Sequence, residues 1–262
     1  MMRVTLLVAI AASSDAFVAP ASRAHRSFDG HATQRRRPHA KAAKEDRDAE
    51  GALPWLGKLA LAGAALGPVC DNFHSGFGVL AYDKYEIAIG AAPAWWGDGH
   101  LFQTAAWVPP LFALAALIIG GIDALVAARA PPAAAPSGAR AAAGVGAFVA
   151  LYALSAALAG APPLGAGVAP ATSSLALWPP ALALWALLDP SPSSFVAGAL
   201  TAVGGPLIEV ALLGGGGAFA EPFGHLYSYA RADLLGVDSW IPAVYFAGGP
   251  AVALVSRYLR YN

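Results

Sequence analysis

Charged residues are scarce in this sequence. Asp, Glu, Lys and Arg make up 12% of its 262 residues, whereas 57% of the residues are hydrophobic. A soluble globular domain carries about 25% charged residues, and a water-soluble fold of this length could not bury so much apolar surface. The scarcity of charge therefore argues against a soluble protein and predicts a chain that lies in a membrane.

Cysteine and the motifs of common enzymes are also nearly absent. The single cysteine, Cys70, excludes an intramolecular disulfide framework and a cysteine-rich metal site. The sequence has no Gly-x-Ser-x-Gly elbow, no phosphate-binding P-loop and no HExxH pair. Beyond residue 50 it has no basic stripe that could bind nucleic acid. We therefore expect no catalytic residue, no metal site and no nucleic-acid partner.

The N-terminus has the features of a targeting leader. Arg3 precedes an apolar run and then small residues, which predicts a signal peptide over residues 1–16. Residues 17–50 begin with Phe17 and are rich in Ala, Ser and Arg, as in a transit peptide. Together the two segments resemble the bipartite plastid presequence of algae. The alternative is an ordinary signal peptide followed by a disordered basic arm. Either reading leaves residues 51–262 as the membrane domain.

Long apolar stretches predict an all-α integral membrane fold, a bundle of six transmembrane helices. Each stretch comes close to the roughly 20 residues that a helix needs to cross a bilayer. The expected helices cover residues 53–69, 107–127, 142–159, 173–188, 195–213 and 240–259.

Basic residues near the helix ends predict the orientation of the bundle. With six spans, one side carries Lys58, Arg129, Arg140, Arg257 and Arg260, and the other side carries only Lys84 and Arg231. Because Lys and Arg accumulate on the cytoplasmic side of membrane proteins, both termini are expected on the cytosolic or stromal side.

Three segments resemble the insulin-induced gene (Insig) family of sterol-responsive membrane regulators. The second expected helix opens with Trp107-Val108-Pro109-Pro110, and the fourth ends at Asp189 before a serine-rich turn. The third segment has a series of residues in the family's order and near its spacing: Tyr227, Tyr229, Asp233, Ser239-Trp240-Ile241-Pro242, Phe246, Gly248-Gly249, Arg257 and Leu259. The resemblance covers about residues 105–262.

The resemblance implies a non-enzymatic regulator of the endoplasmic reticulum membrane. Members of the family bind a sterol within the helix bundle and associate with sterol-sensing membrane proteins. The resemblance makes Asp189 the candidate partner-binding residue, because the family needs the matching loop aspartate for that association. Thr172 lies where the family has a glutamine of its sterol pocket, and Trp107 is a further candidate ligand contact. No cofactor is expected other than a bound sterol or related lipid, and homo-oligomer formation is left open.

Ionisable residues inside expected spans are candidate functional residues, because burying such a group in a bilayer costs at least about 2.5–3.5 kcal/mol. Glu209 lies in the fifth expected helix, beside Ile208 and Val210. It is either a ligand contact or a structural carboxyl that bonds to a neighbouring helix. Asp123, near the end of the second helix, is expected at the interface or as a cap-like residue.

Two other functions are compatible with the sequence. A small plastid-membrane transporter or lipid carrier would use Glu209 and the proline-containing fourth and fifth helices as a path. An intramembrane enzyme would use Asp71, His74 and His225, and a metal centre would use His74, His100 and His225. No metal-binding motif supports the histidine centre. Residues 70–103 form a long loop, which is expected to cap the bundle as a re-entrant or surface-lying segment.

Overall fold

The computed structural model describes residues 38–91, 100–129, 135–162, 164–214 and 225–262, with side chains described from Pro54 onward. The chain divides into two compact units, Met1–Ala42 and Ala43–Asn262. The second unit contains the helix bundle. The predicted signal peptide, 1–16, and the predicted arm up to residue 37 lie outside the described residues.

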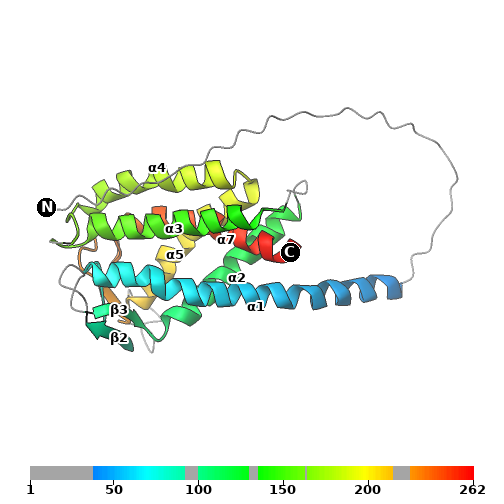
Figure 1. The fold of residues 1–262 in the computed structure, drawn as a ribbon, viewed down its shortest axis with the longest axis horizontal. Coiled ribbons are helices and arrows are strands. Elements are labelled where there is room, and N and C mark those ends of the chain that lie inside the picture. The colour runs from blue at the N-terminus through cyan, green and yellow to red at the C-terminus, as the bar shows by residue number, and fades with distance from the viewer. Residues whose placement is uncertain (1–37, 92–99, 130–134, 163, 215–224) are drawn as a thin grey trace. The chain divides into compact units, whose positions relative to one another are not determined.

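Six long helices are described, and they occur in the predicted order (Figure 1). Their bounds are α1 (Pro38–Gly76), α2 (Val108–Ala127), α3 (Gly138–Ala159), α4 (Pro170–Leu188), α5 (Pro192–Leu212) and α7 (Ile241–Tyr261). Among the described residues, four helices are long and apolar enough to cross a membrane, namely α2, α3, α4 and α5. The prediction of a multi-pass helical membrane protein is confirmed, but the predicted count of six membrane spans is not, because α1 and α7 do not meet this criterion.

Local sequence explains where several helices begin. Pro109 and Pro110 lie in the first turn of α2, where an N–H group would have no helical partner in any case. The hydroxyl oxygen of Ser137 accepts a hydrogen bond from the N–H of Arg140 at 3.2 Å and caps α3. Ser191 caps α5 in the same way, through the N–H of Ser194 at 3.3 Å.

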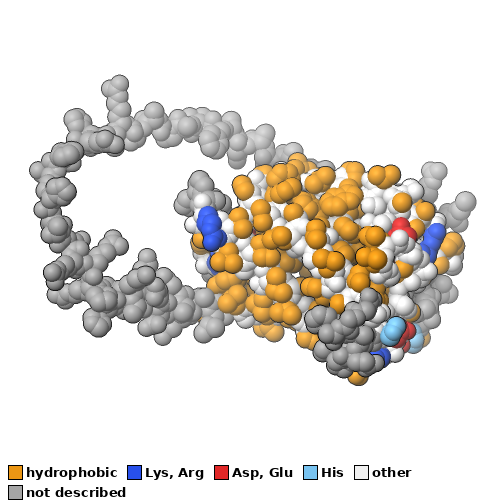
Figure 2. All heavy atoms as spheres, turned by 180° about the vertical axis from the view of Figure 1, so that it is seen from behind, with side chains coloured by type: hydrophobic (Ala, Val, Ile, Leu, Met, Phe, Trp, Pro, Cys, Tyr) orange, Lys and Arg blue, Asp and Glu red, His pale blue; other side chains and the backbone are white. Residues whose placement is uncertain are grey.

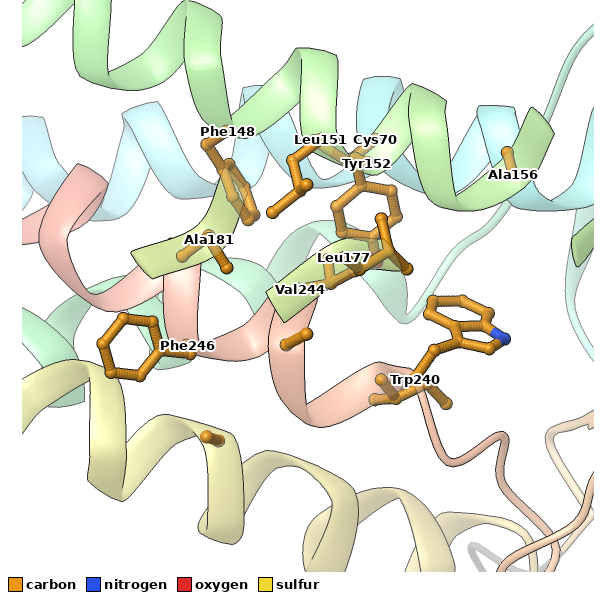
Figure 3. Packing of buried hydrophobic residues seen from close by; sticks show 14 of the residues in the cluster. Cys70, Phe148, Leu151, Tyr152, Ala156, Leu177, Ala181, Trp240, Val244 and Phe246 are labelled. Atoms are coloured by element: carbon orange, nitrogen blue, oxygen red, sulfur yellow. The ribbon is translucent and has the colours of Figure 1, made fainter. Parts of the chain in front are cut away.

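Helix α7 lies at the centre of the bundle, where it packs against α2, α3, α4 and α5. Most of its residues are buried. Figure 3 shows Phe148 and Tyr152 of α3 and Leu177 of α4 beside Val244 of α7, with the fully buried Trp240 at the start of that helix. A helix surrounded by protein does not need a lipid-compatible surface, which explains why α7 tolerates polar residues.

The outer helices expose apolar side chains instead of burying them. Leu175 of α4 is 76% exposed and Val203 of α5 is 63% exposed. Figure 2 shows hydrophobic side chains spread over one whole face of the molecule. An apolar surface of this extent would be unfavourable in water and is expected for helices that face lipid.

Short strands correct the all-α prediction. Strand β1 (Leu80–Tyr82) pairs antiparallel with β4 (Tyr227–Tyr229), and β2 (Glu86–Ala91) pairs antiparallel with β3 (His100–Ala105). Three of these strands lie in the segment that was expected to be a re-entrant or surface-lying loop. Its backbone groups are satisfied by strand pairing, including pairing with a segment far along the chain.

Candidate functional site

Glu209 of α5 is the centre of a buried polar cluster. The residue is 7% exposed. The Tyr229 hydroxyl of β4 donates a hydrogen bond to Glu209 Oε2 at 2.8 Å, and the Tyr245 hydroxyl of α7 donates one to Oε1. The carboxyl group therefore connects three elements, and each of its oxygens has a donor inside an otherwise apolar region.

The Tyr229 hydroxyl, which lies in β4 and outside the helices, stays protonated and acts as a hydrogen-bond donor. Burial, and next the neighbouring Glu209 carboxyl, raise the pKa of the Tyr229 hydroxyl well above its ordinary value. The hydroxyl therefore stays protonated at physiological pH and donates a hydrogen bond to Glu209. This fixes the direction of the hydrogen bond and leaves further acceptor positions on the carboxyl oxygens.

A cavity of about 130 Å³ lies between α2 and α5, with Glu209 in its wall. We call it the α2–α5 slot. Its polar lining residues are Thr201, Glu209 and Tyr245, and no Lys or Arg lines it. The remaining lining residues are apolar or glycine: Leu111, Ala115, Ile118, Ile119, Ile122, Leu200, Gly204, Gly205, Ile208 and Leu212. Along α2 the lining extends over about 17 Å at 1.5 Å per residue.

A second cavity, of about 290 Å³, is lined by residues of α1, α2, α3 and α7 and is open to the surface. All of its lining residues are apolar or glycine: Leu59, Ala62, Gly63, Ala65, Leu66, Val69, Ala116, Val145, Phe148, Ala251, Val252 and Val255. Such a cavity suits a hydrocarbon group and offers no side chain that would orient a polar one.

The other two predicted ligand contacts line neither cavity. Thr172 is exposed in the first turn of α4. Trp107 precedes α2 and stacks on Tyr227, with ring centroids 5.2 Å apart. Among the described residues, its buried indole N–H has no hydrogen-bond partner. Of the three predicted ligand contacts, Glu209 therefore lines a cavity, and Thr172 and Trp107 do not.

Asp189, the predicted partner-binding residue, follows α4 and is 4% exposed. Its Oδ2 accepts a hydrogen bond from a terminal guanidinium nitrogen of Arg257, and the two side chains form an ion pair. An aspartate in a short proline-rich turn is usually exposed. The structure instead buries the Asp189 carboxylate against α7, through a contact between residues 68 positions apart.

Asp123 of α2 extends this group of charges and was expected at the interface. The residue is fully buried, with 0% of its surface exposed. Its Oδ2 lies 3.4 Å from Arg257 Nε and 3.1 Å from a terminal nitrogen of Arg260. We call Asp123, Asp189, Arg257 and Arg260 the four-charge cluster. In the sequence, an aspartate stands at or after the ends of α2 and α4, and two arginines stand near the end of α7. The sequence does not indicate that these charges pair.

The geometry does not support the predicted histidine metal centre. His74 of α1 is buried, with its Nε2 2.8 Å from Ser155 Oγ, and it stacks on Tyr152. Asp71 accepts a hydrogen bond from the Tyr82 hydroxyl. Within the described ranges, no three histidine, cysteine or acidic residues come together as a metal-binding group, so His74, His100 and His225 do not form one.

Comparison with known proteins supports the resemblance drawn from the sequence. No protein-family model matches the chain. The Insulin-induced gene 1 protein of Danio rerio is 36% identical over 86 residues, which cover 33% of this chain and 31% of that protein. The chain therefore matches about a third of the length of this curated relative.

Solved structures show that the fold is shared. The crystal structure of an Insig homolog from Mycobacterium vanbaalenii matches with a TM-score of 0.59 and 22% identity, covering 79% of this chain and 94% of the homolog. A cross-linked trimer of the same homolog matches equally well. Together with the sequence match, this confirms the family resemblance.

Proposed function

We propose that this chain, a membrane protein of the Insig family, is a non-enzymatic regulator that binds a sterol or related lipid within its helix bundle. In this proposal the ligand-bound protein associates with other polytopic membrane proteins, of the sterol-sensing type, to control sterol or lipid metabolism. Its location is the endoplasmic reticulum membrane, as in the family. The plastid alternative rests on the leader alone, of which residues 1–37 lie outside the described residues.

The α2–α5 slot is the observation that carries the proposal. Its walls are apolar over most of their length, and its hydrogen-bonding groups are few: the Glu209 carboxyl, the Tyr245 hydroxyl and the Thr201 hydroxyl. The absence of Lys and Arg from the lining disfavours an anionic lipid head group, which would be buried beside a carboxyl without a counter-ion. A sterol hydroxyl can donate to a free acceptor position on Glu209, while the ring system fills the apolar part.

A bulky substitution inside the slot tests this assignment. Gly204 lines the slot, and a Cβ atom added there meets no atom within 4 Å, so this position has room for a larger side chain to begin. Gly204→Phe should therefore fill the slot without disturbing helix packing. The affinity of the purified full chain in detergent for radiolabelled cholesterol should fall at least about tenfold. A tenfold loss corresponds to about 1.4 kcal/mol of binding free energy, which is no more than the free energy gained by burying one apolar side chain.

The matched control is Gly146→Phe in α3. Gly146 also has open space around it and lines neither cavity. This variant should bind cholesterol as the unmodified chain does. Equal binding by the Gly204→Phe variant and the unmodified chain would contradict the assignment of the ligand to the slot.

A further inference from the structure

The four-charge cluster joins three separate parts of the bundle. Arg257 and Arg260 come from α7, Asp123 from α2, and Asp189 from the turn between α4 and α5. Two carboxylates face two guanidinium groups, so the cluster is electrically neutral. Arg257 is the link, because it contacts both carboxylates and is itself 4% exposed.

The turn that carries Asp189 is held by several further hydrogen bonds. The Ser194 hydroxyl donates to the Asp189 carbonyl oxygen at 2.7 Å, and the Ser191 N–H donates to the same oxygen at 2.7 Å. The Trp185 indole N–H donates to the Ser191 carbonyl oxygen at 3.2 Å. These bonds shape the turn from within, whereas the Asp189–Arg257 pair attaches it to the central helix.

An aspartate in this state is poorly suited to direct recognition by another protein. Its carboxylate is buried and already engaged by a guanidinium of its own chain. A partner that took over the carboxylate would leave Arg257 with an unpaired contact, and an uncompensated buried charge is strongly unfavourable. By contrast, Pro190 is exposed and Ser191 is half-buried, so the turn itself can be reached from outside.

We infer that Arg257 is a positioning residue that fixes the turn of residues 189–193, and that Asp189 acts in partner association through Arg257 rather than by touching a partner. The surface available to a partner is then the turn. The part about association rests on the proposed function. The part about positioning concerns only this chain and stands without a partner.

Hydrogen–deuterium exchange of the purified full chain tests the positioning. Peptides that cover residues 189–195 should exchange at least about tenfold faster in Arg257→Gln, because removing one member of a buried ion pair is strongly destabilising. Asp189→Asn should have a similar effect. The two effects should not add in the double variant, because both remove the same interaction.

Two further variants provide the rescue and the control. Arg257→Lys keeps the positive charge between Asp123 and Asp189 without the forked geometry, and should give exchange between that of the unmodified chain and that of Arg257→Gln. Arg231→Gln removes an exposed arginine that donates to the Val168 carbonyl oxygen, and it should leave exchange at 189–195 unchanged. Unchanged exchange in Arg257→Gln, or fully additive effects, would overturn the inference.

Association is measured separately, by co-purification with a co-expressed sterol-sensing membrane protein. Asp189→Asn and Arg257→Gln should each reduce recovery of the partner at least about tenfold, and Arg257→Lys should restore part of it, because part of the turn geometry returns. Lost association by Asp189→Asn with unchanged exchange at residues 189–195 would show that a partner contacts the Asp189 carboxylate directly, which contradicts the inference. No association by the unmodified chain would count against the proposed function, while the exchange result would still decide the positioning.

Discussion

At the scale of single residues, the buried polar groups are paired with partners far away in the sequence. Glu209 is bonded to tyrosines 20 and 36 positions further along the chain. Asp189 is bonded to Arg257, 68 positions away. The sequence pointed to Glu209 and Asp189 because charges in or beside apolar stretches are costly. It did not indicate their partners, since no local pattern links residues at such separations.

Substitution of Glu209 separates the role of its shape from the role of its hydrogen bonds. Glu209→Gln keeps the side-chain size and one acceptor oxygen, and its amide N–H can donate to the hydroxyl oxygen of the other tyrosine, so the bundle should lose little stability. Glu209→Leu leaves the Tyr229 and Tyr245 hydroxyls without their acceptor. Each such group costs about 1–3 kcal/mol. Thermal unfolding in detergent should therefore show a much lower midpoint for Leu than for Gln.

The same two variants distinguish a structural from a ligand-binding carboxyl. If Glu209 contacts a sterol hydroxyl, the Gln variant should unfold near the temperature of the unmodified chain but bind cholesterol more weakly. Normal cholesterol binding by a stable Gln variant would mean that the carboxyl serves the fold alone.

At the scale of elements, the helices could be predicted from the sequence and the strands could not. Among the described residues, α2 to α5 each contain an apolar stretch long enough to cross a membrane, and prolines or serines mark several of the helix starts. Strands β1 and β4 have only three residues each, and each exists because it pairs with the other. Residues 80 and 229 come together only once the bundle has formed. The long loop was recognised as unusual, but its pairing could not be deduced.

Contact between α5 and α7 depends on the absence of a side chain at Gly249. A Cβ atom added at this position would lie 2.3 Å from the Gly198 backbone, too close for any side chain. Gly249→Ala must push the two helices apart, and overpacking of this kind costs about 1–3 kcal/mol. The variant should show a lower unfolding temperature in detergent.

Gly146→Ala is the matched control for that substitution. A methyl group at this position of α3 meets nothing within 4 Å. The change should be neutral or stabilising by about 1 kcal/mol, the difference in helix propensity between glycine and alanine. Equal unfolding temperatures for the two variants would contradict close α5–α7 packing as a source of stability.

At the scale of the whole molecule, the bundle has its most apolar helices outside and a more polar helix inside. Helices α2 to α5 expose large apolar side chains, whereas α7 in the middle carries Arg257 and Arg260. This arrangement was not evident from hydropathy, which identifies a span but not its neighbours. The arrangement is favourable in a membrane, because lipid surrounds an apolar outer surface at little cost and the protein interior can supply partners for charged side chains.

The central claim is that a sterol occupies the α2–α5 slot. Photo-crosslinking of the purified full chain with a diazirine analogue of cholesterol tests it most directly, followed by mapping of the labelled peptides. We predict labelling within residues 108–127 and 192–212 that excess cholesterol displaces and that Gly204→Phe abolishes. Displaceable labelling found only outside these two helices and at residues other than Tyr245, which also lines the slot, or labelling that excess cholesterol does not displace, would contradict the claim.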